Sequence, residues 1–176
     1  MSDADDEAVI AEIRGLLGST VDQLVGAGAR DEAVASFVPA RRVLLVDRRA
    51  SMQPLGRAWR LGVFLLHRDR VLRATGSITR AVEPGHPGHQ AVSVERRREQ
   101  RAAAYRAFPL GETVNFDAPV IELDADSLRS TDGPLFLREG RPVVRWNAAL
   151  GDAAGRDLQP YLAEFAELLL HPPEGA

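Results

Sequence analysis

The residues best suited to chemistry in this chain lie in the segment Thr113–Pro119, which reads TVNFDAP. If this segment is extended, alternate side chains point to the same face, so Asn115 and Asp117 face one way and Phe116 faces the other. An amide and a carboxylate on one face can hydrogen-bond a ligand or orient a water molecule. They can equally close an Asx-turn ahead of the proline. The spacing alone leaves both interpretations open.

Both tryptophans of the chain stand beside arginines. Arg57, Trp59 and Arg60 precede one β-rich run, and Arg145 and Trp146 end another. A guanidinium group can stack on the ring of a ligand or pair with an anion, whereas an indole in a strand can also be part of the core. The candidate ligand-binding set therefore consists of Arg57, Trp59, Arg60, Asn115, Asp117, Arg145 and Trp146.

Sets of residues for metal binding and catalysis are sparse. His86 and His89 have H-x-x-H spacing, but they stand in a segment rich in proline and glycine with no third ligand adjacent. The chain has no cysteine, and all 22 of its basic residues are arginine, which excludes thiolate nucleophiles, Schiff bases and P-loops. No serine in an elbow motif lies near His67 or His171. We expect no metal and no cofactor, and the sequence assigns no catalytic residue.

Charge is distributed unevenly along the chain, whose net charge is −3. Residues 41–106 carry 15 arginines and five acids, whereas 1–40 carry two arginines and eight acids, and 107–176 carry five arginines and 12 acids. The basic middle can be neutralised by the acidic ends within the fold, or part of it can form a site for an anion. The net negative charge argues against a protein that coats nucleic acid.

Periodicity predicts helices over residues 3–26, 95–107 and 157–170. Two hairpins are predicted: one over 59–78 with its turn at 67–69, and one over 135–146 with its turn at 139–141. Further extended segments are predicted over 38–46 and 120–123, and residues 83–91 form a loop. We expect both hairpins to lie in one antiparallel sheet.

Because strands come in hairpin pairs rather than in βαβ units, the fold class is α+β: a mainly antiparallel sheet or small barrel with N-terminal, inserted and C-terminal helices. We expect a single domain over 1–176, in which the helical segment 1–28 packs on a core formed by 29–176. A composition of 45% hydrophobic and 27% charged residues is that of a globular chain. The first residues have no signal-peptide pattern and no apolar run is long enough to cross a bilayer, so we expect a bacterial cytoplasmic protein.

Two resemblances add expectations of their own. The hairpin segment 61–76, LGVFLLHRDRVLRATG, resembles the hairpins of bacterial PH-like and GRAM-like domains, which implies a small antiparallel barrel closed by a C-terminal helix. The segments 54–63, 113–119 and 144–147 resemble a group of small proteins of GC-rich bacteria, some of which are labelled glutaminase. The known glutaminase chemistries need a Ser-x-x-Lys motif or a cysteine, and this chain has neither.

Two hypotheses for function follow. The first is a non-enzymatic binding or scaffold module. This hypothesis leaves open whether the protein forms a homo-oligomer and whether it binds a small anionic ligand. The second is a hydrolase or transferase acting on a small anionic or amide substrate, with Asn115 and Asp117 beside arginines from 57 to 80. Only the second requires those side chains to converge in one pocket.

Overall fold

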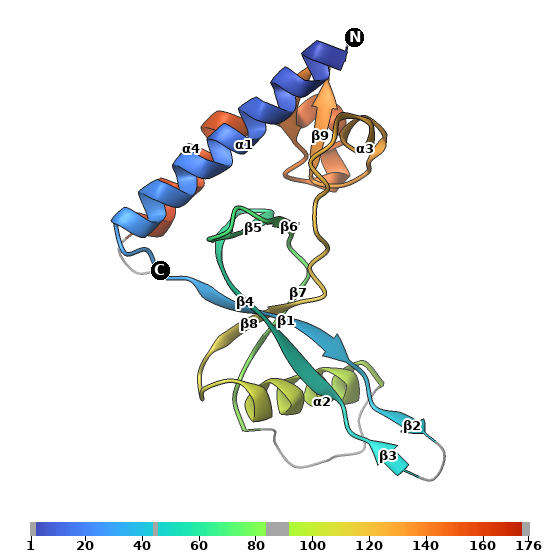
Figure 1. Ribbon diagram of the computed structural model, residues 1–176. Coiled ribbons are helices and arrows are strands. Elements are labelled where there is room, and N and C mark those ends of the chain that lie inside the picture. Colours follow the sequence, from blue (N-terminus) through green and yellow to red (C-terminus); the bar gives the residue numbers. More distant parts are fainter. Residues whose placement is uncertain (1–2, 44–45, 84–91, 174–176) are drawn as a thin grey trace. The chain divides into compact units, whose positions relative to one another are not determined.

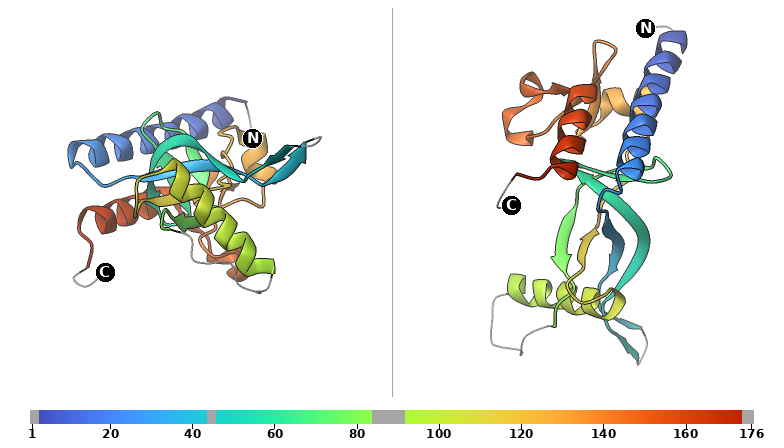
Figure 2. Two further views of the ribbon diagram at one scale, coloured as in Figure 1. Left: turned by 90° about the horizontal axis from the view of Figure 1, so that it is seen from below. Right: turned by 90° about the vertical axis from the view of Figure 1, so that its left-hand side faces the viewer.

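The computed structural model describes residues 3–43, 46–83 and 92–173 of the chain (Figures 1 and 2). Its helices are α1 (Asp3–Gly26), α2 (Val92–Ala107), α3 (Ala125–Ser130) and α4 (Leu158–Leu170), with two short 3-10 helices, η1 (Ala148–Leu150) and η2 (Asp152–Ala154). No helix in the described part of the chain is long and apolar enough to cross a membrane.

Eleven strands occur among the described residues: β1 (Glu32–Val38), β2 (Arg41–Val43), β3 (Val46–Arg48), β4 (Ser51–Leu61), β5 (Phe64–His67), β6 (Leu72–Ala74), β7 (Ser77–Arg80), β8 (Thr113–Phe116), β9 (Leu135–Arg138), β10 (Arg141–Val144) and β11 (Arg156–Asp157). Hydrogen-bonded neighbours give a six-stranded sheet in the order β6-β5-β4-β1-β8-β7, a three-stranded sheet β11-β10-β9 and the pair β2-β3. The pairings β1–β4, β5–β6 and β7–β8 are antiparallel, and β1–β8 is parallel.

The chain divides into two compact units. Unit 1 comprises Met1–Asp31, Trp59–Ala74 and Pro119–Ala176, and unit 2 comprises Glu32–Ala58 and Thr75–Ala118. The pairings β1–β4, β1–β8 and β7–β8 lie in unit 2, and β5–β6, β9–β10 and β10–β11 lie in unit 1. The strand β4 begins in unit 2 and ends in unit 1. The single domain expected over 1–176 stays a prediction.

The core of unit 1 is built on α1 and α4, which pack on one another (Figure 1). Apolar residues of α1 recur at spacings of three and four and are buried: Val9, Ile10, Ile13, Leu17, Val21 and Leu24. From α4, Leu158, Tyr161, Leu162 and Ala166 are buried in the same cluster, which also holds Trp59, Phe64 and Leu72. The helix α1 ends where Gly28 takes a φ of 64° and the amide of Ala29 reaches back to the carbonyl of Leu24 at 2.9 Å.

Unit 2 has a smaller core of its own, in which α2 packs on one face of its strands (Figure 2). Ala103 and Ala104 of α2 are buried against Ala33 and Ala35 of β1, together with Val114 and Phe116 of β8. Because most of these side chains are small, the helix backbone can approach the sheet closely. The register of β1 against β4 shifts between Val34 and Ala35, opposite Pro54, as expected for a proline that cannot donate to the ladder.

The structure confirms the α+β class and the mainly antiparallel sheet, and corrects several details. Helices over 3–26, 95–107 and 157–170 are confirmed, α2 beginning earlier, at Val92. The sheet does not close into a barrel among the described residues, since β6 and β7 stand at its two ends. The hairpin over 135–146 exists, but it belongs to the separate three-stranded sheet, so the expectation of one sheet for both hairpins was wrong.

The hairpin predicted over 59–78 is divided between more strands than expected. Its central part is correct, because β5 pairs with β6 around a turn in which the amide of Arg70 bonds the carbonyl of His67 at 3.0 Å. Residues 59–61 instead end the long strand β4, and β7 pairs with β8. Residues 120–123 form no strand, only a single bridge from Val120 to Arg73, and the short helix α3 was not predicted.

A buried histidine in unit 1 gives a testable pH dependence. His67 is 7% exposed, and its Nε2 atom has no hydrogen-bond partner among the described residues. Burial, and next the charge of Arg73, lower the pKa of His67 below its ordinary value of 6.5. The folded state therefore favours the neutral imidazole, and the unfolded chain binds more protons as the pH falls through 6.5.

We therefore expect the wild-type protein to lose stability as the pH falls below about 6.5, and the loss to continue down to the folded-state pKa. His67→Leu should abolish this part of the pH dependence, whereas His171→Leu should not, because that residue is exposed at the end of α4. Urea denaturation between pH 7.5 and 5.5 measures both. Parallel stability curves for the wild type and His67→Leu would refute the prediction.

Candidate functional site

The segment 119–124 in unit 1 separates two pockets. It continues the edge of the sheet beside β6, because the amide of Ala74 bonds the carbonyl of Pro119 and the amide of Ile121 bonds the carbonyl of Leu72, both at 2.9 Å. Val120, Ile121 and Glu122 line the pockets on both sides. We call the segment 119–124 the dividing segment.

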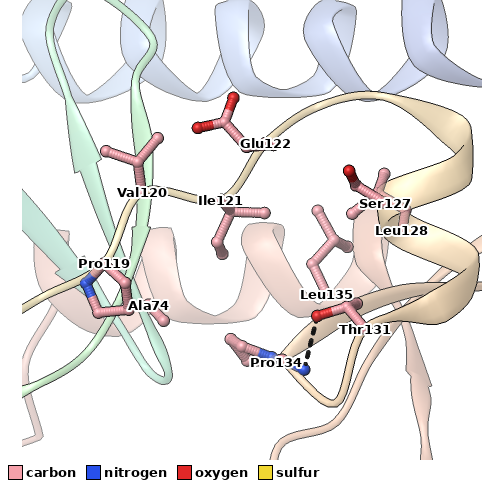
Figure 3. Close-up of a pocket in the computed structure, with 11 residues that line it drawn as sticks. Ala74, Pro119, Val120, Ile121, Glu122, Ser127, Leu128, Thr131, Pro134 and Leu135 are labelled. Carbon is pink, nitrogen blue, oxygen red and sulfur yellow. Dashed lines mark hydrogen bonds between the residues drawn. The ribbon is translucent and has the colours of Figure 1, made fainter.

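The first pocket has a volume of about 270 Å³ and lies between the dividing segment and α3 with the start of β9. Figure 3 shows Val120 and Ile121 on one side of it, and Leu128, Thr131 and Leu135 on the other. Its lining is mainly apolar. Glu122, Ser127 and Thr131 are its polar side chains, and the hydroxyl of Thr131 already accepts a hydrogen bond from the amide of Gly133 at 2.9 Å.

The helix α3 is fixed at this pocket by its N-cap. The carboxylate of Asp124 accepts a hydrogen bond from the amide of Ser127 at 2.9 Å. The hydrogen bonds that it receives from Ser127 lower the pKa of Asp124. The first turn of α3 is thereby held at the end of the dividing segment, and Leu128 is buried below it.

The second pocket, of about 440 Å³, lies between the dividing segment, α1 and the β5–β6 turn. The apolar part of its lining consists of Leu17, Val71, Leu72, Val120, Ile121 and Leu123. Arg14, Asp69, Arg70, Glu122 and Asp124 supply its charges. The carboxylate of Asp69 accepts a hydrogen bond from the amide of Val71 at 3.2 Å, which helps to shape the turn.

Three of the residues predicted as a site lie in unit 2. Asn115 is fully buried, and its amide donates to the carboxylate of Glu32 at 2.7 Å and to the carbonyl of Ala33 at 3.3 Å. The strand β8 ends at Phe116, and Asp117 has a φ of 53°, so the alternation that would place Asp117 beside Asn115 ends before it. Asp117 is exposed and accepts a bond from the amide of Phe37 at 3.4 Å.

Arg57, the third of these residues, pairs with Glu112 at 3.0 Å. Arg57, the first of the arginines expected beside Asn115 and Asp117, is thus engaged with a different carboxylate. Arg57, Asn115 and Asp117 are thus bonded to different residues of unit 2 and share none of the partners named here.

The other four predicted residues lie in unit 1. Trp59 is buried in the core, its indole donating to the carbonyl of Ala29 at 3.0 Å, and Arg60 follows it in β4. The guanidinium of Arg145 bonds Asp152 at 2.7 Å and lies over the ring of Phe136, and the indole of Trp146 donates to the carbonyl of Ala154 at 2.9 Å. Arg145 and Trp146 thus hold the segment of η1 and η2 against the β9–β10 hairpin.

The histidine pair considered for metal binding, His86 and His89, lies outside the described residues. Among the residues that the structure does describe, no group of three or more His, Asp or Glu side chains is placed to hold a metal ion. The absence of a metal and of a cofactor stays a prediction.

Sequence reasoning missed the two pockets because most of their lining is apolar and comes from distant segments of the chain. The glycines at positions 15 and 18 of the helix 3–26 do not mark the pockets either, because a Cβ atom would meet nothing within 4 Å at Gly15 and would make an ordinary van der Waals contact with Arg70 at Gly18.

No family model, curated protein or solved structure matches this chain. The resemblances to PH-like domains and to glutaminase-labelled proteins stay expectations. The pockets of unit 1 must therefore be interpreted from their own chemistry.

Proposed function

We propose that this protein is a non-enzymatic binding module of the bacterial cytoplasm, and that it holds a small, largely apolar molecule in unit 1. The observation that carries the proposal is the pair of pockets on either side of the dividing segment. The second pocket, of about 440 Å³, has the size of typical small-molecule sites, and the first, of about 270 Å³, is slightly smaller. Such sites are mainly apolar with a few polar groups that fix orientation.

The side chains available in these pockets support binding rather than catalysis. The described linings contain two hydroxyls, Ser127 and Thr131, and no histidine that could act as their base. Asp124 caps α3 and Asp69 bonds the backbone of its own turn, so two of the three acids already have a role in the fold. Burial of an apolar ligand against the leucine, valine and isoleucine side chains supplies the binding free energy.

The uncharged fluorescent probe N-phenyl-1-naphthylamine tests the proposal, since its emission rises when it enters an apolar pocket. We expect saturable binding to the folded wild-type protein. Val120 lines both pockets and is 44% exposed, so Val120→Phe should fill part of the space at little cost to the fold. It should raise the dissociation constant of the probe about tenfold, which corresponds to about 1.4 kcal/mol.

A matched control is Ile78→Phe, which enlarges an exposed β-branched side chain on β7 of unit 2. It should leave binding of the probe unchanged. If the folded protein does not bind the probe, or if both variants weaken binding equally, the proposed function is wrong.

A further inference from the structure

Arg70, at the rim of the second pocket, has an unfavourable backbone conformation. Its φ of 69° lies in the left-handed region, where an arginine is rarely found and a glycine is at ease. Arg70 ends the turn between β5 and β6, which a glycine could close with less strain. Non-glycine residues in this region cluster at functional sites, because the surrounding structure must hold them there.

The side chain of Arg70 lies against α1 at Gly18. A Cβ atom added to Gly18, in the interior of α1, would lie 3.4 Å from Cζ of Arg70 and 3.6 Å from its Nε and Nη1 atoms. These are van der Waals distances, so the guanidinium lies directly against α1 at this position. A side chain larger than alanine there would have to displace it. By contrast, a Cβ atom at Gly15 would meet nothing within 4 Å.

A second guanidinium lines the same pocket. Arg14 precedes Gly18 by four residues, which places the two positions on the same side of α1, one turn apart. One of its nitrogens lies 3.4 Å from the carbonyl of Leu123 in the dividing segment. Neither Arg14 nor Arg70 has an ion pair with a carboxylate among the described residues, and Asp69 and Asp124 are bonded to backbone amides.

We infer that the second pocket binds a small apolar molecule with a single anionic group, which lies between Arg70 and Arg14 while the apolar body contacts Val71, Val120 and Ile121. The inference rests on the proposed function and adds the charge of the ligand to it. Two guanidinium groups suit a carboxylate, sulfonate or phosphate, because they give charge-assisted hydrogen bonds that are stronger than neutral ones.

Two probes that differ by one sulfonate test the inference. The anionic probe 8-anilinonaphthalene-1-sulfonate has the same aromatic skeleton as neutral N-phenyl-1-naphthylamine. We expect the wild-type protein to bind the anionic probe more tightly than the neutral one. Added sodium chloride should weaken only the binding of the anionic probe, because salt screens exposed charges.

The sharpest variant is Arg70→Gly, which removes the guanidinium and also relieves the left-handed backbone. It should leave the melting temperature unchanged or raise it, so weaker binding cannot be ascribed to unfolding. We expect the dissociation constant of the anionic probe to rise about tenfold, as for the loss of one charge-assisted contact, and that of the neutral probe to stay the same. Arg30→Gly, in the exposed loop after α1, is the matched control and should change neither value.

Glu122 gives a test of opposite sign. Its carboxylate lines the same pocket and has no ion-pair partner among the described residues. Glu122→Gln should tighten binding of the anionic probe and leave the neutral probe unaffected, since it removes a repulsive charge.

The outcomes separate this inference from the proposed function. If the neutral probe binds and Arg70→Gly leaves the anionic probe unaffected, or if Glu122→Gln weakens its binding, the inference fails and the binding module stands. If neither probe binds the folded protein, both fail.

Discussion

Gly62→Ala is expected to destabilise unit 1 by about 2–5 kcal/mol, the sum of the costs of a left-handed backbone and of a displaced core side chain. Gly62 has a φ of 60°, and a Cβ atom there would lie 2.0 Å from the hydroxyl of Tyr161 and 2.9 Å from the ring of Phe165. That hydroxyl accepts a hydrogen bond from the amide of Val63 at 3.0 Å, which the displacement would break. Trp59 is buried in the same core, so tryptophan fluorescence during urea denaturation measures the loss.

Gly28→Ala provides the control, because Gly28 has nearly the same φ, 64°, and a Cβ atom there would meet nothing within 4 Å. It should cost only the backbone contribution, about 1–2 kcal/mol. In a Tyr161→Phe background the additional cost of Gly62→Ala should be smaller, since the hydroxyl is gone. Equal costs for Gly62→Ala and Gly28→Ala would show that the contact with Tyr161 is not rigid.

The elements that sequence predicts well are those whose signals are local. In α1 and α4 the apolar positions recur with the helical period, and both helices end within a residue or two of the predicted bounds. The β9–β10 hairpin is marked by Glu139-Gly140, and both residues have positive φ, 52° and 75°, as the two-residue turn requires.

The elements that were missed depend on partners far along the chain. The parallel pairing of β1 with β8 joins Ala33 to Val114, and no local pattern predicts it. The segment 120–123 has the composition of a strand, but only Val120 makes a bridge, because α3 begins shortly after it. Residues with a high strand propensity form a strand only where a neighbouring strand offers a surface for their side chains, and the position of that neighbour is determined by the fold as a whole.

The residues of the predicted site were chosen because their side chains carry hydrogen-bonding or charged groups. The structure shows that these groups alone do not identify a binding site. Arg57 has Glu112 as its partner, Arg145 has Asp152, and the indole of Trp146 has the carbonyl of Ala154. Most polar groups in a folded chain are satisfied by that chain. In the second pocket, Arg14 donates to the carbonyl of Leu123, and neither it nor Arg70 has an ion pair with a carboxylate among the described residues.

The second large effect is expected at the hydrogen bond between buried Asn115 and half-buried Glu32. Asn115→Asp places a carboxylate oxygen where the amide nitrogen now lies, 2.7 Å from Oε2 of Glu32 and 3.3 Å from the carbonyl of Ala33. Two acceptors and two negative charges then face each other at a fully buried position. We expect unit 2 to be destabilised at pH 7.5 by about 3–5 kcal/mol, as when a buried charged group loses its partner.

The pH dependence of this loss has a definite sign. In the folded variant the pKa of one of the two facing carboxyl groups must rise above its unfolded value, because only a shared proton restores the hydrogen bond. The destabilisation is therefore largest at high pH and diminishes as the pH falls through the raised pKa. Hydrogen exchange at the amides of β1 and β8 between pH 7.5 and 4.5 follows unit 2 directly.

Two further variants decide whether the pair itself is responsible. Asp117→Asn replaces a carboxylate with an amide two residues away, on an exposed side chain. It should change the free energy of unfolding by no more than about 0.5 kcal/mol. Glu32→Gln combined with Asn115→Asp exchanges the amide and the carboxylate, so that the new amide can donate to the new carboxylate. This double variant should recover much of the stability that Asn115→Asp alone loses. If the double variant is no more stable than Asn115→Asp, the cost arises from the burial of residue 115 alone and not from its pairing with Glu32.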